Sequence, residues 1–372
     1  MPDDFATLFN EEDCQRRITR AERVLDRGHH SVAGHVYYTF VIENAPKIVA
    51  MMLNNERIYD TSEKSGRYTT MRTMGFEREL YEKWQKKFAE LIAREYPTMS
   101  QRQIGKLALE NARLLISVFT PATTMVYTAN LRQLNYLISY CEDFLANIED
   151  DMASAQFFKA LAPVIEELRD KLVELVGVEN LTPPPAFNRF SLFNFQDRVE
   201  DYGETYTTNY LGSFAQLAQA QRHRTLAYEM RLVETEDPGS KFYLPPILEK
   251  YPLVHTEYLE DINKIAFPQG MLVEINERGL FEDFVRKCGE RLCGEAQLEI
   301  CRQTDQTLST YASALEAKYR GGVRRGFGRE QLKDKINILR RMYFGETRCV
   351  FNKYPCKQAC FWGPQSVWDR VV

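Results

Sequence analysis

The sequence lacks the marks of several protein classes. Eight cysteines in 372 residues are too few for a secreted disulfide scaffold. No apolar run approaches the roughly 18–20 residues that a membrane span needs, and the first ten residues lack the basic-then-apolar layout of a signal peptide. We therefore expect a soluble, cytoplasmic protein with no membrane partner.

A strong charge of one sign is also missing. The formal net charge of −4 gives no global attraction to a polyanion, so no nucleic-acid partner is expected. Hydrophobic residues make up 44% and charged residues 27%, a mixture typical of globular proteins. The length is sufficient for two ordinary domains.

Periodicity predicts mostly helices. A run of β-branched and aromatic residues predicts one buried strand at 35–42. Three consecutive prolines, Pro183 to Pro185, must interrupt helical structure, and the Gly/Arg stretch 321–328 reads as a hinge. The predicted domains are 1–182, 186–320 and a C-terminal helix with a Cys-rich tail at 321–372. Helices are predicted at 14–26, 71–95, 100–118, 130–176, 208–222, 255–265 and 270–318.

The two halves share a short pattern, Asn-x-Arg-x-Leu. It begins at Asn130 in the first half and at Asn276 in the second, 146 residues later, and each copy is predicted to lie on a helix. A separation of about one domain length favours a tandem duplication.

Two polar stretches suit an anion. Ser65-Gly66-Arg67 combines a hydroxyl, an open backbone amide and a guanidinium fork, which together suit a phosphate; the alternative is a polar surface loop. Arg222-His223-Arg224 concentrates positive charge, which a protein tolerates around an anion or on a solvated face.

Together these stretches resemble the flavin-dependent thymidylate synthase family. That family carries Arg-His-Arg, followed eight residues after its second arginine by Ser-x-Arg-Tyr. The first half keeps Ser65-Gly66-Arg67-Tyr68 but has Asn55-Glu56-Arg57 in place of Arg-His-Arg. The second half keeps Gln219 and Arg222-His223-Arg224, with Ala227 and Glu234 in place of the serine and the later arginine.

Further stretches extend the resemblance. Gly28 to His35 is similar to the family's Gly-His-x-Ser/Thr-x-x-Glu-His, with Gly34 in place of the glutamate. Ala112-Arg113 resembles an Ala-Arg pair of the family. Arg291 with Ala296-Gln297-x-Glu299-Ile300 resembles its Arg-(x)4-Ala-Gln-x-Glu-Ile, although the spacing from Asn276 is longer by about one helical turn.

The losses are complementary, because each half keeps the motif pieces that the other has lost. Family members are homotetramers with sites between subunits, so a fused chain can retain one composite site. The resemblance implies that dUMP is bound by residues of both halves, namely Ser65, Gly66, Arg67, Arg113, Gln219, Arg222 and Arg291. It implies catalytic roles for Arg222, His223 and Arg291.

The resemblance implies FAD as cofactor, with NADPH and methylenetetrahydrofolate as cosubstrates in the reductive methylation of dUMP at C5. FAD contacts are expected from Arg222, His223, Arg224, Asn276, Ser31 and Glu63, with Glu282 or Asp283 as additional candidates. His29 is a candidate for the folate side, and the alternative for it is a hydrogen-bonded core histidine.

The resemblance also implies an α+β fold with two copies of a helix-flanked, mostly antiparallel sheet domain. A homodimer of the fused chain would imitate the family tetramer. Two alternatives stay open. One is flavin-dependent C5 modification of another pyrimidine nucleotide, and the other is a catalytically degenerate nucleotide-binding or regulatory protein.

The tail holds three thiols within twelve residues, Cys349, Cys356 and Cys360. Zinc would need a fourth ligand, for which Cys288, Cys293 and Cys301 are candidates. The alternative is a packed tail with reduced thiols.

Overall fold

The computed structural model describes residues 11–148, 155–176, 189–233, 235, 237–321, 328–354, 356 and 360–372. The predicted proline boundary and most of the predicted hinge lie outside these ranges. The chain forms two compact units. Unit 1 comprises Met1–Glu43, Glu56–Glu63 and Thr124–Phe190, and unit 2 comprises Asn44–Asn55, Lys64–Thr123 and Ser191–Val372. The predicted domain boundaries stay a prediction.

Unit 1 is built on a sheet of three strands in the order β1-β3-β2. The strands are β1 (Tyr37–Pro46), β3 (Pro121–Asn130) and β2 (Tyr59–Glu63), and the ends of β1 and β3 continue into unit 2. β2 and β3 run antiparallel, with Tyr59 opposite Ala129. The strand predicted at 35–42 exists, but it is not buried: every second side chain of β1, from Tyr37 to Glu43, faces solvent.

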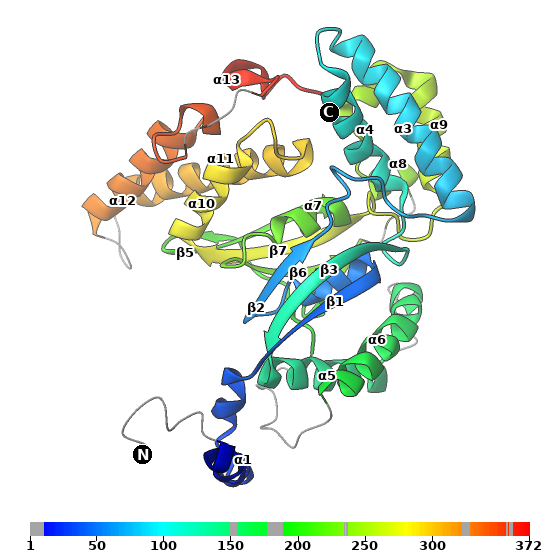
Figure 1. Cartoon of the computed structure of the whole chain (residues 1–372). Helices are drawn as coiled ribbons and strands as arrows, with labels where there is room; N and C mark the ends of the chain where they lie inside the picture. The colour runs from blue at the N-terminus through cyan, green and yellow to red at the C-terminus, as the bar shows by residue number, and fades with distance from the viewer. Residues whose placement is uncertain are drawn as a thin grey trace. The chain divides into compact units, whose positions relative to one another are not determined.

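The helices of unit 1 follow the strands. Asn130 ends β3 and caps α5 (Leu131–Ala146), because its side-chain oxygen accepts a hydrogen bond from the Gln133 amide at 2.8 Å. α5 packs against α6 (Ala155–Val176), as Figure 1 shows. Two helices therefore occupy the helical range predicted at 130–176. α1 (Glu11–Asp26) and the 3₁₀ helix η2 (His30–His35) complete the unit.

Unit 2 contains an antiparallel sheet in the order β4-β5-β7-β6. Its strands are β4 (Asp201–Tyr202), β5 (Thr205–Ser213), β7 (Leu272–Leu280) and β6 (Ala227–Leu232). The helices predicted at 208–222 and 270–318 are therefore wrong in their first parts. β5 carries Thr and Tyr at alternating depths, and this period of two outweighs the helical spacing of its neighbours.

The two copies of the Asn-x-Arg-x-Leu pattern adopt different secondary structures. Asn130 starts a helix, whereas Asn276 lies in the middle of β7, opposite Asn209 on β5 and Glu229 on β6. The prediction that both copies lie on helices is therefore wrong for the second copy. The α+β class with antiparallel sheets is confirmed.

Helices surround the sheet of unit 2. α7, α10 and α11 contact its strands, and α3 packs along α4 (Figure 1). A core of aromatic rings, Trp84, Phe88 and Tyr258, joins α3 to α9, and all three side chains are fully buried. The helices are α2 (Lys47–Leu53), α3 (Gly75–Glu95), α4 (Gln101–Ala112), α7 (Phe214–Ala220), α8 (Pro238–Lys241), α9 (Pro252–Ile262), α10 (Phe281–Arg291), α11 (Leu298–Arg320), α12 (Arg329–Asn337) and α13 (Gly363–Ser366).

The last residues of the sequence pack into unit 2. The Val371 amide donates to the Tyr96 hydroxyl at 3.0 Å, and the Ile247 amide donates to the Val371 carbonyl at 2.8 Å. The Trp362 ring meets the Tyr96 ring edge-on, with centroids 5.0 Å apart. Within the described ranges, no helix combines the length and the apolar character required to cross a bilayer.

Candidate functional site

The Arg222-His223-Arg224 stretch is presented by a short helix. Ser213 ends β5 and caps α7, since its hydroxyl oxygen accepts from the Gln216 amide at 3.0 Å. After α7 the chain turns, with the His223 amide donating to the Ala220 carbonyl at 2.9 Å. The turn leaves Arg222 and Arg224 exposed and buries His223 between them.

His223 is paired with Arg291. The Arg291 Nε donates to His223 Nε2 at 2.8 Å, and Arg291 Nη2 donates to the Gln219 carbonyl at 3.3 Å. Burial, followed by the charge of Arg291, lowers the pKa of His223 to about 2. His223 is therefore a neutral imidazole whose Nε2 accepts and whose proton sits on Nδ1.

Arg291 itself stands in an unfavourable electrostatic environment. Burial is the largest cause that lowers its pKa, and the positive charges of Arg67 and Arg222 act in the same direction, whereas Glu290 opposes them. An anion bound among these guanidinium groups would relieve this cost. The cluster thus has the electrostatic character of an anion site.

Arg67 reaches the same region from the first half of the sequence. Its Nη2 donates to the Glu295 carbonyl at 2.6 Å, and its Nε forms an ion pair with Glu110. Gly66 in the loop that carries Arg67 packs against Met71: a Cβ there would lie 2.6 Å from the Met71 sulfur, so the Met71 side chain would have to shift. The guanidinium predicted to bind phosphate is thus already engaged by a carboxylate of the chain.

Arg113 lies beside this pair. It is buried, and its Nη2 donates to Gln297 Oε1 at 2.7 Å. Although burial favours the neutral acid, Arg67 and Arg113 hold the pKa of Glu110 below its usual range. Both arginines therefore bond to the second half of the sequence: Arg67 to Glu295, 228 residues away, and Arg113 to Gln297, 184 residues away.

Other predicted residues lie elsewhere. The Asn276 side chain is fully buried in the sheet, where its Nδ2 donates to the Gln196 carbonyl at 3.2 Å. Glu282 and Asp283 occupy the first turn of α10, at the opposite end from Arg291. Three further candidates, Ser31, Glu63 and His29, belong to unit 1.

The histidine alternatives can be separated. His29 is exposed, so it is not the core histidine that the alternative required. Its neighbour His30 is the buried one, with Nε2 2.9 Å from the Leu25 carbonyl. The folate role of His29 stays a prediction.

Sequence reasoning missed Glu110 and the buried pair of Glu277 and Lys287. The signal for Glu110 was its position three residues before Arg113 on a helix. Lys287 Nζ lies 2.7 Å from Glu277 Oε2, and both side chains are fully buried. The hydroxyls of Tyr206 and Tyr210 donate to the same carboxylate at 2.6 and 2.7 Å. A lysine on an amphipathic helix gives no sequence signal of burial.

The cysteines of the tail do not form a ready-made metal site. Among the described residues, no group of three His, Cys, Asp or Glu side chains is placed to hold a metal ion. Cys293, a candidate for the fourth ligand, lies near tail cysteines: burial raises the pKa of its thiol, and Cys360 and Cys349 raise it further.

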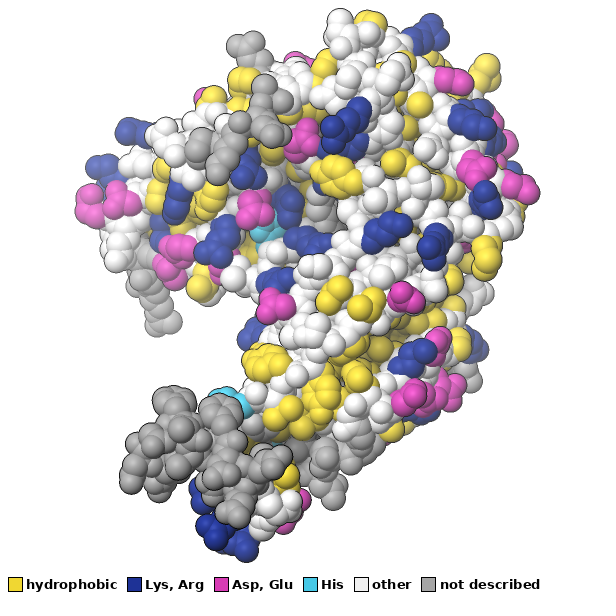
Figure 2. All heavy atoms as spheres, in the orientation of Figure 1, with side chains coloured by type: hydrophobic (Ala, Val, Ile, Leu, Met, Phe, Trp, Pro, Cys, Tyr) yellow, Lys and Arg dark blue, Asp and Glu magenta, His cyan; other side chains and the backbone are white. Residues whose placement is uncertain are grey.

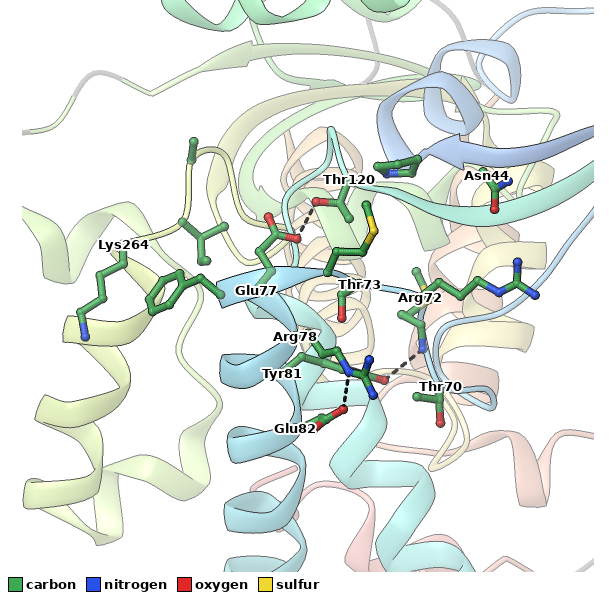
Figure 3. Close-up of a pocket in the computed structure, with 16 residues that line it drawn as sticks. Asn44, Thr70, Arg72, Thr73, Glu77, Arg78, Tyr81, Glu82, Thr120 and Lys264 are labelled. Carbon is green, nitrogen blue, oxygen red and sulfur yellow. Dashed lines mark hydrogen bonds and ion pairs between the residues drawn. The ribbon is translucent and has the colours of Figure 1, made fainter.

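Unit 2 also contains an open cavity of ≈ 1110 Å³ (Figure 3). It is lined by the loop 70–74, the start of α3, Thr120 and Lys264, and by none of the predicted site residues. Thr120 donates to Glu77 at 2.6 Å, and the Met71 amide donates to the Tyr81 hydroxyl at 3.3 Å. Met71 lines this cavity, and its sulfur also packs against Gly66. The cavity therefore adjoins the loop that carries Arg67.

Part of the chain is similar to a known protein family. Residues 4–149 match the family model described as "Thymidylate synthase complementing protein". These residues are thus similar to the flavin-dependent thymidylate synthase family. The matched range contains Arg67, Glu110 and Arg113, whereas Arg222 and Arg291 lie beyond it.

Three relatives carry the name flavin-dependent thymidylate synthase. Those of Pyrococcus abyssi and Pyrococcus furiosus are 31% and 29% identical over 148 residues, covering 36% of this chain and 57% of each relative. That of Thermococcus onnurineus is 29% identical over 156 residues, covering 38% of this chain and 60% of the relative. The match thus spans less than two thirds of the relatives' own length.

Proposed function

We propose that this chain is a flavin-dependent enzyme that methylates dUMP reductively at C5, at one composite site formed by both halves of the sequence. The observation that carries the proposal is the convergence of Arg67 and Arg113 with Glu295 and Gln297, which lie four and six residues beyond Arg291. A duplicated and fused family domain would produce this arrangement, with each half supplying part of the site.

The residues of the cluster fit an anionic nucleotide. Arg291 is buried close to the charges of Arg67 and Arg222, and the phosphate of dUMP would offset their mutual repulsion. Arg67 would bind this phosphate in place of part of the ion pair that it forms with Glu110. Arg113 would contribute a second positive charge from the buried side of the site.

The turn after α7 fits FAD. Arg222 and Arg224 are exposed on either side of the buried His223, so two cationic side chains are presented to an anionic cofactor. Bound FAD would supply hydride, with NADPH as the reductant, and methylenetetrahydrofolate would supply the one-carbon unit. Within the chain, neutral His223 orients Arg291, and the guanidinium groups stabilise negative charge that develops on the uracil ring.

The test compares Arg222→Ala with Arg231→Ala. Arg231 is a matched control, since it lies nine residues further along on β6 and pairs with Glu274 and Asp197 outside the cluster. Wild-type protein and Arg231→Ala, loaded with FAD, should show flavin absorbance bands that dUMP perturbs. Arg222→Ala should bind dUMP at least about tenfold more weakly, because a charge-assisted hydrogen bond is lost.

Two outcomes would overturn the proposal. A wild-type protein that cannot be loaded with FAD would exclude a flavoenzyme. Equal dUMP affinities for Arg222→Ala and Arg231→Ala would exclude the turn after α7 from the nucleotide site.

Two observations favour a second candidate function. Arg67 is held by Glu110 and the Glu295 carbonyl, and Gly34 replaces a family carboxylate. A nucleotide-binding regulatory protein without catalysis would tolerate both features. Such a protein would bind dUMP without flavin. A colourless protein that still binds dUMP would therefore support this second candidate.

A further inference from the structure

Glu299 connects the two parts of the proposed site. It lies in the first turn of α11 and is buried. Its Oε1 accepts from the Ser213 amide at 2.6 Å, and its Oε2 accepts from the Ser213 hydroxyl at 2.6 Å. The same Oε2 accepts from Gln297 Nε2 at 3.1 Å. One carboxylate therefore receives three hydrogen bonds from two segments.

The bonds to Ser213 fix the helix that presents the cationic turn. Ser213 is the cap of α7, and its hydroxyl also accepts from the Gln216 amide. α7 carries Gln219, whose carbonyl accepts from Arg291, and ends just before Arg222. A shift of Ser213 would therefore move the whole turn, since α7 is only seven residues long.

The hydrogen bond from Gln297 to Glu299 fixes the other part of the proposed site, the part that contains Arg113. Gln297 holds Glu299 with its amide nitrogen and Arg113 with its amide oxygen. The orientation of this amide is determined by both partners at once, because the nitrogen can only donate and the oxygen can only accept. A continuous chain of hydrogen bonds thus runs from Arg113 through Glu299 to the start of α7.

We propose that Glu299 is a positioning residue of the nucleotide site, which holds Arg113 and the Arg222 turn in register through Gln297 and Ser213. The inference rests on the proposed function for its ligand, dUMP. It requires the ionised carboxylate, which only accepts hydrogen bonds. A protonated carboxyl group presents a donor where Ser213 and Gln297 already donate.

The surroundings of Glu299 make this requirement measurable near neutral pH. Burial raises its pKa to about 7, although Ser213 and Arg113 act in the opposite direction. The charged or titratable groups that face it are Arg113, Tyr243 and Tyr258. Glu299 therefore changes from mostly ionised at pH 8 to mostly protonated at pH 6.

The experiment measures the dissociation constant of dUMP for the wild-type protein and Glu299→Gln at pH 8 and pH 6. The variant should bind more weakly by about tenfold at pH 8 and by only about twofold at pH 6, where wild-type Glu299 is itself protonated. Taking the ratio at each pH cancels the titration of the dUMP phosphate. A merely structural role would give the same ratio at both pH values, and that result would overturn the proposal.

Asp261→Asn is the matched control. Asp261 is also a buried carboxylate that joins two helices, where it accepts from Trp84 Nε1 at 2.9 Å and pairs with Lys264 at 2.8 Å. It lies outside the proposed site, so its variant should keep wild-type affinity for dUMP at both pH values. If Glu299→Gln does not fold, Ser213→Ala replaces it, with a smaller loss that shrinks in the same way at pH 6.

Amide hydrogen exchange separates this inference from the proposed function. At pH 8, without ligand, Glu299→Gln should accelerate exchange in residues 214–224 relative to Asp261→Asn. A wild-type protein that fails to bind dUMP would overturn the proposed function alone. Unchanged exchange in 214–224 would overturn the positioning role of Glu299, whatever the ligand.

Discussion

At the scale of single residues, the site is governed by how burial changes charge. His223 is a neutral hydrogen-bond acceptor next to Arg291, because protonation of its ring would place a second positive charge in the same buried volume. Its role therefore depends on the folded environment and not on the ordinary chemistry of histidine at neutral pH.

His223 should make the protein less stable in mild acid. Its pKa of about 2 in the folded state lies below the ordinary value of 6.5, so the unfolded chain takes up a proton first as the pH falls below 6.5. This group should cost about 2 kcal/mol of the free energy of unfolding between pH 6.5 and pH 5. The comparison is urea unfolding of the wild type and His223→Gln at pH 7.5 and pH 5.

Because glutamine does not titrate, the stability difference between the two proteins should move in favour of His223→Gln at pH 5. All other titrating groups cancel in this difference. Parallel losses in both proteins would show that His223 is protonated in the folded state.

At the scale of elements, α10 is tied to the sheet by a buried ion pair. Lys287 and Glu277 hold each other where no water reaches them, and Gln303 on α11 accepts a further hydrogen bond from Lys287 Nζ at 2.8 Å. Lys287 precedes Arg291 by one turn on the same helix. The pair therefore fixes the helix that carries the buried arginine.

Lys287→Met should destabilise the protein by about 3–5 kcal/mol, because it leaves the Glu277 carboxylate buried without its counter-ion. Lys318→Met is the control, since Lys318 forms an exposed ion pair with Asp201, worth less than about 1 kcal/mol. Denaturant unfolding measures both. The double variant Lys287→Met with Glu277→Gln should recover part of the loss, and a loss for Lys287→Met as small as that of the control would refute the account.

At the scale of the whole molecule, we expect a homodimer as part of the proposed function. If each chain is a fusion of two family domains, as proposed, two chains contain as many such domains as the family tetramer. Exposed apolar side chains on the sheet of unit 1, namely Tyr37, Val41 and Val126, provide a surface for association.

Sedimentation should give twice the chain mass of 43.4 kDa. Val41→Lys should shift the equilibrium toward the monomer, because it places a charge in the apolar surface, whereas Ile18→Lys on α1 should not. A tetramer of chains would contradict the prediction.

How far the sequence reaches can be judged from particular elements. The similarity to the family and the α+β class could be predicted from short motifs, because Ser65-Gly66-Arg67 and Arg222-His223-Arg224 retain recognisable spacing. Helical periodicity predicted the start of α5 closely and the range of α9 with a small offset, but it did not locate the end of α5. β5 and β7 were missed, since a strand in a sheet is stabilised by partners that are distant in sequence.

The sequence by itself determined which residue types this protein brings to its candidate site, and that each half keeps what the other has lost. Only the tertiary structure decided their states: Arg67 paired with Glu110, His223 neutral beside Arg291, and Asn276 buried in the sheet. The physical reason is that burial and long-range contacts set charge and hydrogen bonding. Neither is encoded in the spacing of a motif.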